Sequence, residues 1–483
     1  MKQIAFLFAL LLSLSTSAAT KNWDLKVSDN QRFLQYTDGT PFFWLGDTGW
    51  LLPQRLDQNE AGGYLTRASE MGFNVVQIQV INGVPATNIY GQYSNNPSDP
   101  WNFDVFTTKK NPMVYDYWDH LDRIVQMAEG KGIYIGMVCI WGGLVKGGAI
   151  DVKGAKAYGK FLAERYKDKP NIIWIIGGDI QGDIKPEVWE ALATTIKSID
   201  KKHLMTYHPR GRYTSARWWS KADWLDFHMY QSGHRAYGQR MGNKDYPIPD
   251  NTEEDCWMYV DSTWNYKPIK PVLDGEPSYE DIPIGLHFPE GPRWQASDVR
   301  RYAYWNVFGG ACGHTYGHNA IMQMVKPSYG VAYAKESKTW YEAQKDPGYT
   351  QMRYLKALML ALPFTDRVPD QSIVSNNGEK YERLLATRGT DYLLIYNYIA
   401  REMKVDLSRI SGEKKNVWWM DASSGKLSYI GEYSNKNITF RPDVQKGGIS
   451  DGVLIAIDAS KNYLSTKQED ILNKPLLQVK SEE

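Results

Sequence analysis

The stretch NIIWIIGGD at residues 171–179 decides the fold, because it is an unbroken apolar run that ends in two glycines and an acid. A run that is apolar at every position is typical of a parallel strand covered on both faces. Similar runs recur between residues 40 and 320. The predicted strands are 42–46, 75–80, 133–140, 172–177, 204–208, 225–230, 272–274 and 308–313.

Amphipathic helices separate these runs. Trp118, Leu121, Val125 and Ala128 follow helical spacing, and the segment 189–199 repeats the same pattern. Eight strands alternating with helices predict an α/β fold, a (β/α)₈ TIM barrel over residues 20–365.

The hydrophobic pattern of the sequence changes after a predicted helix at 351–362. Short alternating runs at 381–387, 391–398 and 416–420 are separated by turn signals at 376–378, 423–425 and 447–448. This pattern predicts a small C-terminal β-sandwich over residues 366–460, followed by a polar tail at 461–483.

The N-terminus resembles a secretory signal. Lys2 precedes an apolar run from Ile4 to Leu14, and small residues follow at 17–19. We therefore expect a signal peptide at residues 1–19 and export to the periplasm or the extracellular space; a buried N-terminal strand or helix is the alternative. No stretch reaches the roughly 20 apolar residues of a membrane span, so none is expected.

Charge and cysteine content exclude several function classes. Lys plus Arg number 56 and Asp plus Glu 55, which leaves no excess positive charge for nucleic acid. Cys139, Cys256 and Cys312 are odd in number and widely spaced, so we expect buried thiols rather than disulfides.

Two carboxylates follow predicted strands in Gly-flanked settings. Asp179 follows the fourth strand, and Glu276 ends KPVLDGE at 270–276, after the seventh. Reacting groups of barrel enzymes lie at the carboxyl ends of strands, and positions three strands apart face each other. Glycoside hydrolysis needs such a pair of facing carboxyl groups. The alternative for each acid is a rim salt bridge or a helix cap.

Different surroundings suggest different roles. Asp179, near Trp174 and other aromatic residues, is predicted to stay protonated and act as general acid. Glu276 is predicted to be ionised beside Arg or His donors and to act as nucleophile. Asp183 and Asp274 are competing acids; if 272–276 is extended, Asp274 shares a side with Glu276 and supports it. The carboxyl separation, and with it retaining or inverting chemistry, stays open at this point.

Polar and aromatic residues after the other strands are the candidates for substrate binding. They are Asp47, Trp50, Gln79, Trp141, His208, Arg210, His228, Tyr230, His314 and Tyr316. His314 and His318 are four residues apart, but glycines precede both and no HExxH motif occurs. We therefore expect neither a metal nor a cofactor.

Four segments carry a family resemblance: DGTPFFWLGDTGW (38–50), GFNVVQIQV (72–80), NIIWIIGGD (171–179) and PVLDGEPSYE (271–280). Together they resemble the apiosidase-like glycoside hydrolases, and the sandwich resembles the domain labelled collagen-binding in that family. The resemblance implies release of a terminal sugar, such as apiose, from a plant polysaccharide such as pectic side chains. It also implies Asp179 as acid/base and Glu276 as nucleophile, in a retaining double displacement, with Asp47 and Trp50 binding the non-reducing sugar.

Other functions remain as alternatives. After a glycoside hydrolase, the second possibility is a non-catalytic carbohydrate-binding or surface-adhesion protein that kept the barrel, and the third is a protease or collagen-binding protein. For the hydrolase and the carbohydrate-binding protein, the partner is an oligosaccharide or polysaccharide. The sequence gives no prediction of the oligomeric state.

Overall fold

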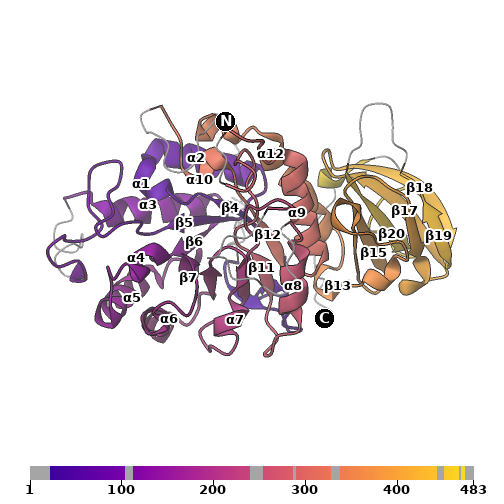
Figure 1. Ribbon diagram of the computed structural model, residues 1–483. Coiled ribbons are helices and arrows are strands. Elements are labelled where there is room, and N and C mark those ends of the chain that lie inside the picture. Colours follow the sequence, from indigo (N-terminus) through magenta and orange to yellow (C-terminus); the bar gives the residue numbers. More distant parts are fainter. Residues whose placement is uncertain are drawn as a thin grey trace, which may run out of the picture.

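The computed structural model describes residues 22–103, 113–239, 254–286, 290–327, 338–442, 451–466 and 469–473. The predicted signal peptide, the turn at 447–448 and most of the predicted tail lie outside these residues. Figure 1 shows the two units side by side, the barrel in indigo to salmon and the sandwich in orange to yellow.

Eight parallel strands form the barrel, as predicted. In chain order they are β4 (Trp44–Thr48), β5 (Val75–Gln79), β6 (Tyr134–Val138), β7 (Ile172–Ile180), β8 (Met205–Pro209), β10 (His228–Gln231), β11 (Val272–Asp274) and β12 (Gly313–Tyr316). The first strand β4 pairs with the last, β12. The seam between β8 and β10 is bridged by the amide of Asp226, which donates to the Met205 carbonyl at 2.9 Å.

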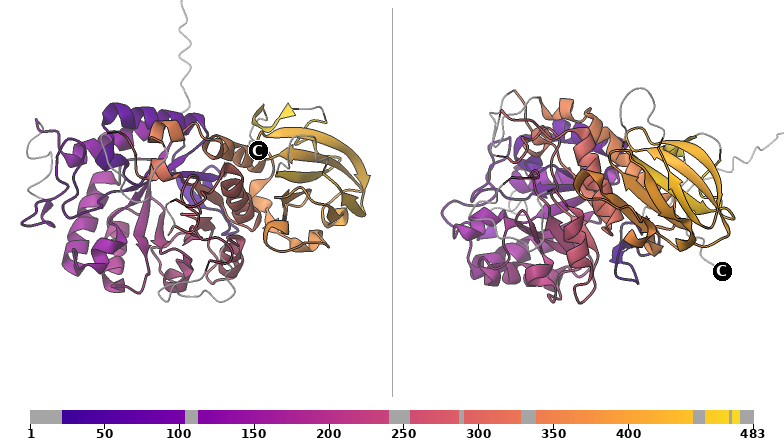
Figure 2. Two further views of the ribbon diagram at one scale, coloured as in Figure 1. Left: turned by 45° about the horizontal axis from the view of Figure 1, so that its top comes forward. Right: turned by 45° about the vertical axis from the view of Figure 1, so that its right-hand side comes forward.

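Helices surround these strands (Figures 1 and 2). They are α1 (Leu52–Arg55), α2 (Gln58–Glu70), α3 (Tyr117–Gly130), α4 (Gly142–Lys146), α5 (Val152–Tyr166), α6 (Pro186–Ile199), α7 (Ala216–Trp219), α8 (Trp257–Trp264), α9 (Ala296–Phe308), α10 (Asn319–Met322), α11 (Trp340–Ala343) and α12 (Pro347–Leu360). The predicted helical segments coincide with α3, α6 and α12. Capping boxes fix the start of α2 at Asp57 and of α3 at Asp116.

The predicted eighth strand at 308–313 is wrong by several residues. Phe308 is the last residue of α9, and Gly310 turns the chain with a φ of +124° before β12 begins at Gly313. Apolar residues fill both a buried helix end and a buried strand, so the pattern alone does not separate them.

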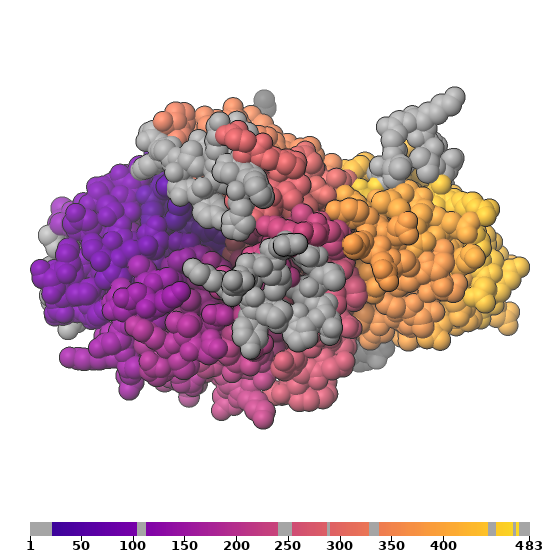
Figure 3. Space-filling view, in the orientation of Figure 1, coloured from indigo at the N-terminus to yellow at the C-terminus, as the bar shows by residue number. Residues whose placement is uncertain are grey.

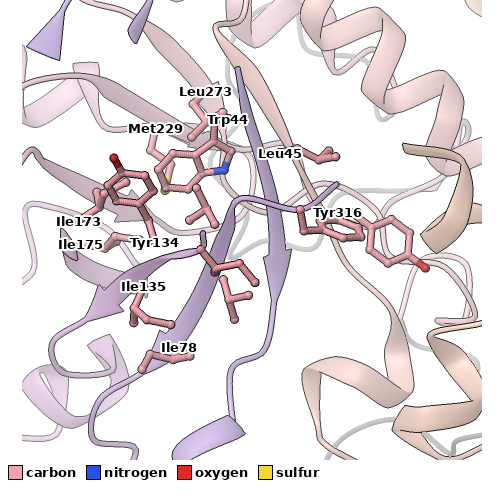
Figure 4. Packing of buried hydrophobic residues seen from close by; sticks show 14 of the residues in the cluster. Trp44, Leu45, Ile78, Tyr134, Ile135, Ile173, Ile175, Met229, Leu273 and Tyr316 are labelled. Atoms are coloured by element: carbon pink, nitrogen blue, oxygen red, sulfur yellow. The ribbon is translucent and has the colours of Figure 1, made fainter. Parts of the chain in front are cut away.

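Side chains alternate between the inside of the barrel and the helix layer. Trp44 of β4 points inward and packs near Met229 and Leu273, whereas Leu45 and Tyr316 point the opposite way (Figure 4). The Trp44 indole donates to Oγ1 of Thr315 at 3.1 Å inside the barrel. This alternation decides which strand residues can reach the carboxyl-end opening.

A small sheet covers the other end of the barrel. It consists of β1 (Leu25–Val27), β2 (Leu34–Tyr36) and β3 (Pro41–Phe42). The Tyr134 hydroxyl at the start of β6 donates to the Trp23 carbonyl at 2.6 Å, which ties this sheet to the barrel.

The C-terminal unit is a β-sandwich of antiparallel strands, as predicted. Its large sheet has the order β13 (Val368–Pro369), β14 (Leu384–Arg388), β15 (Tyr392–Asn397), β20 (Gly452–Asp458), β17 (Lys414–Asp421), β18 (Lys426–Ser434) and β21 (Glu469–Asp470); β16 (Met403–Asp406) pairs with β19 (Asn437–Phe440). Leu393 and Val405 belong to the core between the sheets, while Tyr396 faces the barrel. Covered on both faces, β15 and β20 are buried at every position.

All three cysteines are buried and unpaired, which confirms that part of the prediction. None of the described helices is long and apolar enough to cross a bilayer.

Candidate active site

A cavity of about 440 Å³ lies at the carboxyl ends of the barrel strands. Its walls combine two indole rings, three arginines, one histidine and two carboxylates. These are Trp50, Trp141, Arg210, Arg212, Arg235, His234, Asp179 and Glu276, joined by residues including Gln79 and Gln231.

Asp179 stands on an irregular end of β7. Gly177, Gly178 and Asp179 all have positive φ, and the register with β8 shifts between Gly177 and Ile180. A Cβ at Gly178 would lie 2.8 Å from the Trp141 ring, so the close approach of these groups requires glycine. The bulge presents the Asp179 side chain to the cavity, where it is exposed between buried neighbours.

Glu276 lies two residues beyond β11 and is 8% exposed. Its two carboxylate oxygens each face an imidazole: Oε2 lies 3.2 Å from Nε2 of His208, and Oε1 lies 3.4 Å from Nε2 of His234. The backbone N–H of Glu276 donates to Oδ1 of Asp274 at 3.2 Å. The side chain and the backbone of Glu276 are therefore both held in place.

His208 connects the two carboxylate-bearing segments. The backbone N–H of Asp179 donates to its Nδ1 at 3.2 Å. Since Nδ1 accepts, the ring proton belongs on Nε2, which faces Glu276. The ring also packs edge-on against Trp50, with centroids 5.5 Å apart.

The two carboxylates differ in proton affinity. Although the Asp179 side chain is open to the cavity, protein atoms surround it, and this desolvation and the negative charge of Glu276 both raise its pKa. Burial also raises the pKa of Glu276, but the imidazoles of His208 and His234 outweigh burial and hold that pKa below its usual value. The site thus favours one protonated and one ionised carboxyl group, the difference expected of an acid and a nucleophile.

Four of the predicted substrate-binding residues line the cavity: Trp50, Gln79, Trp141 and Arg210. Trp50 is fixed by its indole N–H, which donates to the Tyr279 hydroxyl at 3.0 Å. His208 does not line the cavity but lies behind its wall, where its Nε2 contacts Glu276.

Five predicted site residues lie elsewhere, because they point from their strands into the helix layer. They are Asp47, His228, Tyr230, His314 and Tyr316. Asp47 is fully buried and accepts from the Tyr64 hydroxyl of α2 at 2.7 Å. Tyr230 stacks on Tyr259 of α8, and Tyr316 donates to Glu280. The expectation that these five residues contact substrate is therefore corrected.

His228 and His314, the remaining two of these five residues, also point into the helix layer, and so does Asp274. His228 lies 3.4 Å from the Ser215 hydroxyl, and His314 lies 3.5 Å from Asn306 of α9; both rings are buried. Asp274 accepts from Asn306 at 2.8 Å, on the helix side of β11. Because β11 ends at Asp274, the predicted shared side with Glu276 is wrong, although Asp274 does support Glu276 through the backbone bond.

The sequence interpretation missed Arg212, His234, Arg235 and Tyr279. Arg212 is 4% exposed and lines the cavity, and its Nε and Nη1 have no partner within the described residues. These residues lie in loops after β8, β10 and β11, where no periodicity acts. The only available signal was the density of Arg and His in loops longer than plain connections.

No group of three or more His, Cys, Asp or Glu side chains able to hold a metal ion occurs among the described residues.

Comparison with known proteins identifies two matching family models. The family model "Apiosidase-like, catalytic domain" matches residues 28–366. A second model, "Putative collagen-binding domain of a collagenase", matches residues 368–457. No curated protein matches the chain.

Two solved structures are similar over almost the whole chain. One is a glycoside hydrolase family 5 protein from Bacteroides vulgatus, with 56% identity and a TM-score of 0.89, covering 92% of this chain and 96% of the other. The second, described as a glycoside hydrolase, has 58% identity and a TM-score of 0.88, covering 92% and 98%.

Proposed function

This chain belongs to the apiosidase-like glycoside hydrolases, and from that membership we propose that it releases a terminal sugar from pectic side chains by a retaining double displacement. In this proposal Asp179 is the acid/base and Glu276 the nucleophile. The observation that carries the assignment is the unequal environment of the two carboxylates, with imidazoles facing Glu276 alone.

The first step forms a covalent glycosyl-enzyme. An oxygen of Glu276 attacks the anomeric carbon while the glycosidic C–O bond breaks, and Asp179 gives its proton to the departing oxygen. In the second step Asp179 takes a proton from water, and that water attacks the anomeric carbon and releases Glu276 as carboxylate. The Nε2–H groups of His208 and His234 stabilise the negative charge on Glu276 before and after the covalent stage.

The cavity walls support an acidic polysaccharide as substrate. The indoles of Trp50 and Trp141 provide apolar faces for a sugar ring, and their centroids are 5.7 Å apart. The guanidinium of Arg212 lines the cavity, and a cation there suits a carboxylate, because such a pair forms charge-assisted hydrogen bonds. Uronic acid residues of pectin carry this group, and apiose is the terminal sugar that we favour.

Export completes the proposal. Pectin is a polymer that lies outside the cytoplasm, and this supports the predicted signal peptide and a periplasmic or extracellular location.

One screen tests the function. The purified protein is incubated with pectic and hemicellulosic oligosaccharides, and each released monosaccharide is identified by chromatography. We expect one terminal sugar, released from an acidic pectic fragment. Proton NMR of the first-formed anomer then distinguishes retention from inversion; an inverted product would contradict the double displacement.

A further inference from the structure

Helix α9 is shared by the barrel and the sandwich. Its residues from Val299 to Phe308 are all buried, because barrel and sandwich cover opposite faces. Tyr304 of α9 stacks on Tyr396 of β15 with centroids 4.7 Å apart, and Arg300 forms a bidentate ion pair with Asp451 at 3.0 and 2.5 Å. Figure 3 shows the two units in direct contact.

The connection between the two units is also packed rather than extended. Arg367 follows the last residue matched by the catalytic family model, is 1% exposed and donates to the carbonyls of Val307 and Ala311. The sandwich is therefore attached as a rigid neighbour and not as a module on a tether.

A buried carboxylate at this junction joins the sandwich to the active site. Glu254 is 1% exposed, and its Oε2 accepts from Nη2 of Arg301 at 2.6 Å. The hydroxyl of Tyr381, from the sandwich, donates to Oε1 and Oε2 at 3.0 and 3.1 Å. The backbone N–H of Tyr237, from the barrel, donates to the same Oε1 at 2.8 Å.

Tyr237 belongs to residues 232–239, here called the cavity loop. This loop contributes His234, which faces Glu276, and Arg235, which lines the cavity. The sandwich contacts the loop a second time, since the rings of Tyr237 and Tyr381 are 5.3 Å apart and Nζ of Lys380 lies 5.2 Å from the Tyr237 ring.

We propose that the sandwich is a structural part of the active site, in which Tyr381 acts through Glu254 as a positioning residue for the cavity loop. By holding this loop, the sandwich sets the geometry of His234 and Arg235 toward the substrate. Only the kinetic test of this inference rests on the proposed function. It gives the C-terminal unit a role that does not require it to bind collagen or sugar.

Two matched substitutions test this role. Tyr381→Phe keeps the ring and removes the hydroxyl that bonds Glu254. Tyr396→Phe is the control, because it removes a hydroxyl at the same interface that donates to Asp451 of the sandwich at 2.7 Å, away from the cavity loop. Hydrogen exchange followed by mass spectrometry reports on the peptides that cover residues 232–239, and steady-state kinetics separates KM from kcat.

We expect Tyr381→Phe to speed exchange in the cavity loop and to lower kcat/KM, each by about tenfold, with KM raised through Arg235 and kcat lowered through His234, as loss of one hydrogen bond to a charged group implies. Tyr396→Phe should lower the melting temperature and leave loop exchange and KM unchanged. Wild-type exchange in the Tyr381 variant, or equal effects in both variants, would overturn the inference. The exchange measurement needs no substrate, so it decides the matter even if the proposed sugar release fails.

Discussion

Nε2 of His208 lies 3.2 Å from Oε2 of Glu276, and this contact sets the charge distribution of the site. Because Nδ1 of the same ring accepts the Asp179 amide, the proton is directed toward Glu276 and away from Asp179. One histidine thereby stabilises the ionised form of Glu276, while desolvation in the cavity and the charge of Glu276 favour the protonated form of Asp179.

Replacing Glu276, the proposed nucleophile, should abolish turnover without unfolding the protein. We expect Glu276→Gln to lower kcat by about 10⁴-fold or more, because the amide cannot form the glycosyl ester. Circular dichroism and the melting temperature report on the fold. Asp183→Asn is the matched control, since Asp183 is exposed and does not line the cavity. Full activity of the Gln variant would end the assignment.

Removing Asp179, the proposed acid, should affect substrates unequally. We expect Asp179→Ala to slow hydrolysis of the natural substrate by about 10²- to 10⁴-fold, and to slow aryl glycosides with acidic leaving groups much less, because these need no protonation. Added azide should restore turnover and give a glycosyl azide of retained configuration. Equal losses on both kinds of substrate would remove Asp179 from the acid role.

The pH profile of kcat/KM should be bell-shaped. Glu276 must be ionised, and its pKa is lowered, so activity is lost on the acid side as the pH falls through that pKa. Asp179 must be protonated, and its pKa is raised by burial and by the charge of Glu276, so activity is lost on the alkaline side as the pH rises through it. His234→Asn should move only the acid limb, to higher pH. An unmoved acid limb would show that His234 does not stabilise the Glu276 carboxylate.

Much of the barrel could be predicted, but the direction of its side chains could not. The strands are apolar at nearly every position because helices cover one face and the barrel core the other, so hydrophobicity does not distinguish inside from outside. Asp47 and Tyr230 were therefore predicted at the cavity and lie behind it. Trp50 and Asp179 lie beyond that ambiguity, at strand ends that open directly into the cavity.

The loop residues escaped prediction for a different reason. Arg212 and His234 are positioned by turns and by contacts with residues distant in the chain, which no periodic pattern records. The role of the sandwich was hidden likewise, because the bond from Tyr381 to Glu254 joins residues 127 positions apart in the chain.

The anchoring role of Asp274 can be separated from general stability. Its carboxylate accepts from Glu276 N, from the backbone and hydroxyl of Ser232, and from Asn306, so Asp274→Asn places an amide where only donors meet. We expect a loss of about 1–3 kcal/mol in the free energy of unfolding, measured in urea, together with a lower kcat.

Asp226→Asn serves as the control for this loss. Asp226 accepts from Met205 N and Lys197 at 2.7 Å each, far from the cavity, so its replacement should cost stability and leave kcat unchanged. A normal kcat in the Asp274 variant would show that the Glu276 backbone needs no such anchor.

Arg212 should decide the preference for acidic substrates. We expect Arg212→Gln to raise KM for uronate-containing oligosaccharides by about 10- to 100-fold and to leave neutral analogues unaffected, since a hydrogen bond to a charged group is lost. Arg217→Gln, at an exposed position outside the cavity, is the control. Equal changes for acidic and neutral substrates would contradict a carboxylate-binding role.

The paired glycines before Asp179 also offer a criterion for sorting related genes. A methyl group at Gly177 would meet the His208 carbonyl oxygen at 2.5 Å, and one at Gly178 would meet the Trp141 ring at 2.8 Å. A homologue that keeps the acid but replaces either glycine must carry its carboxyl group elsewhere. Such sequences are natural places to look for members that have changed reaction or lost it.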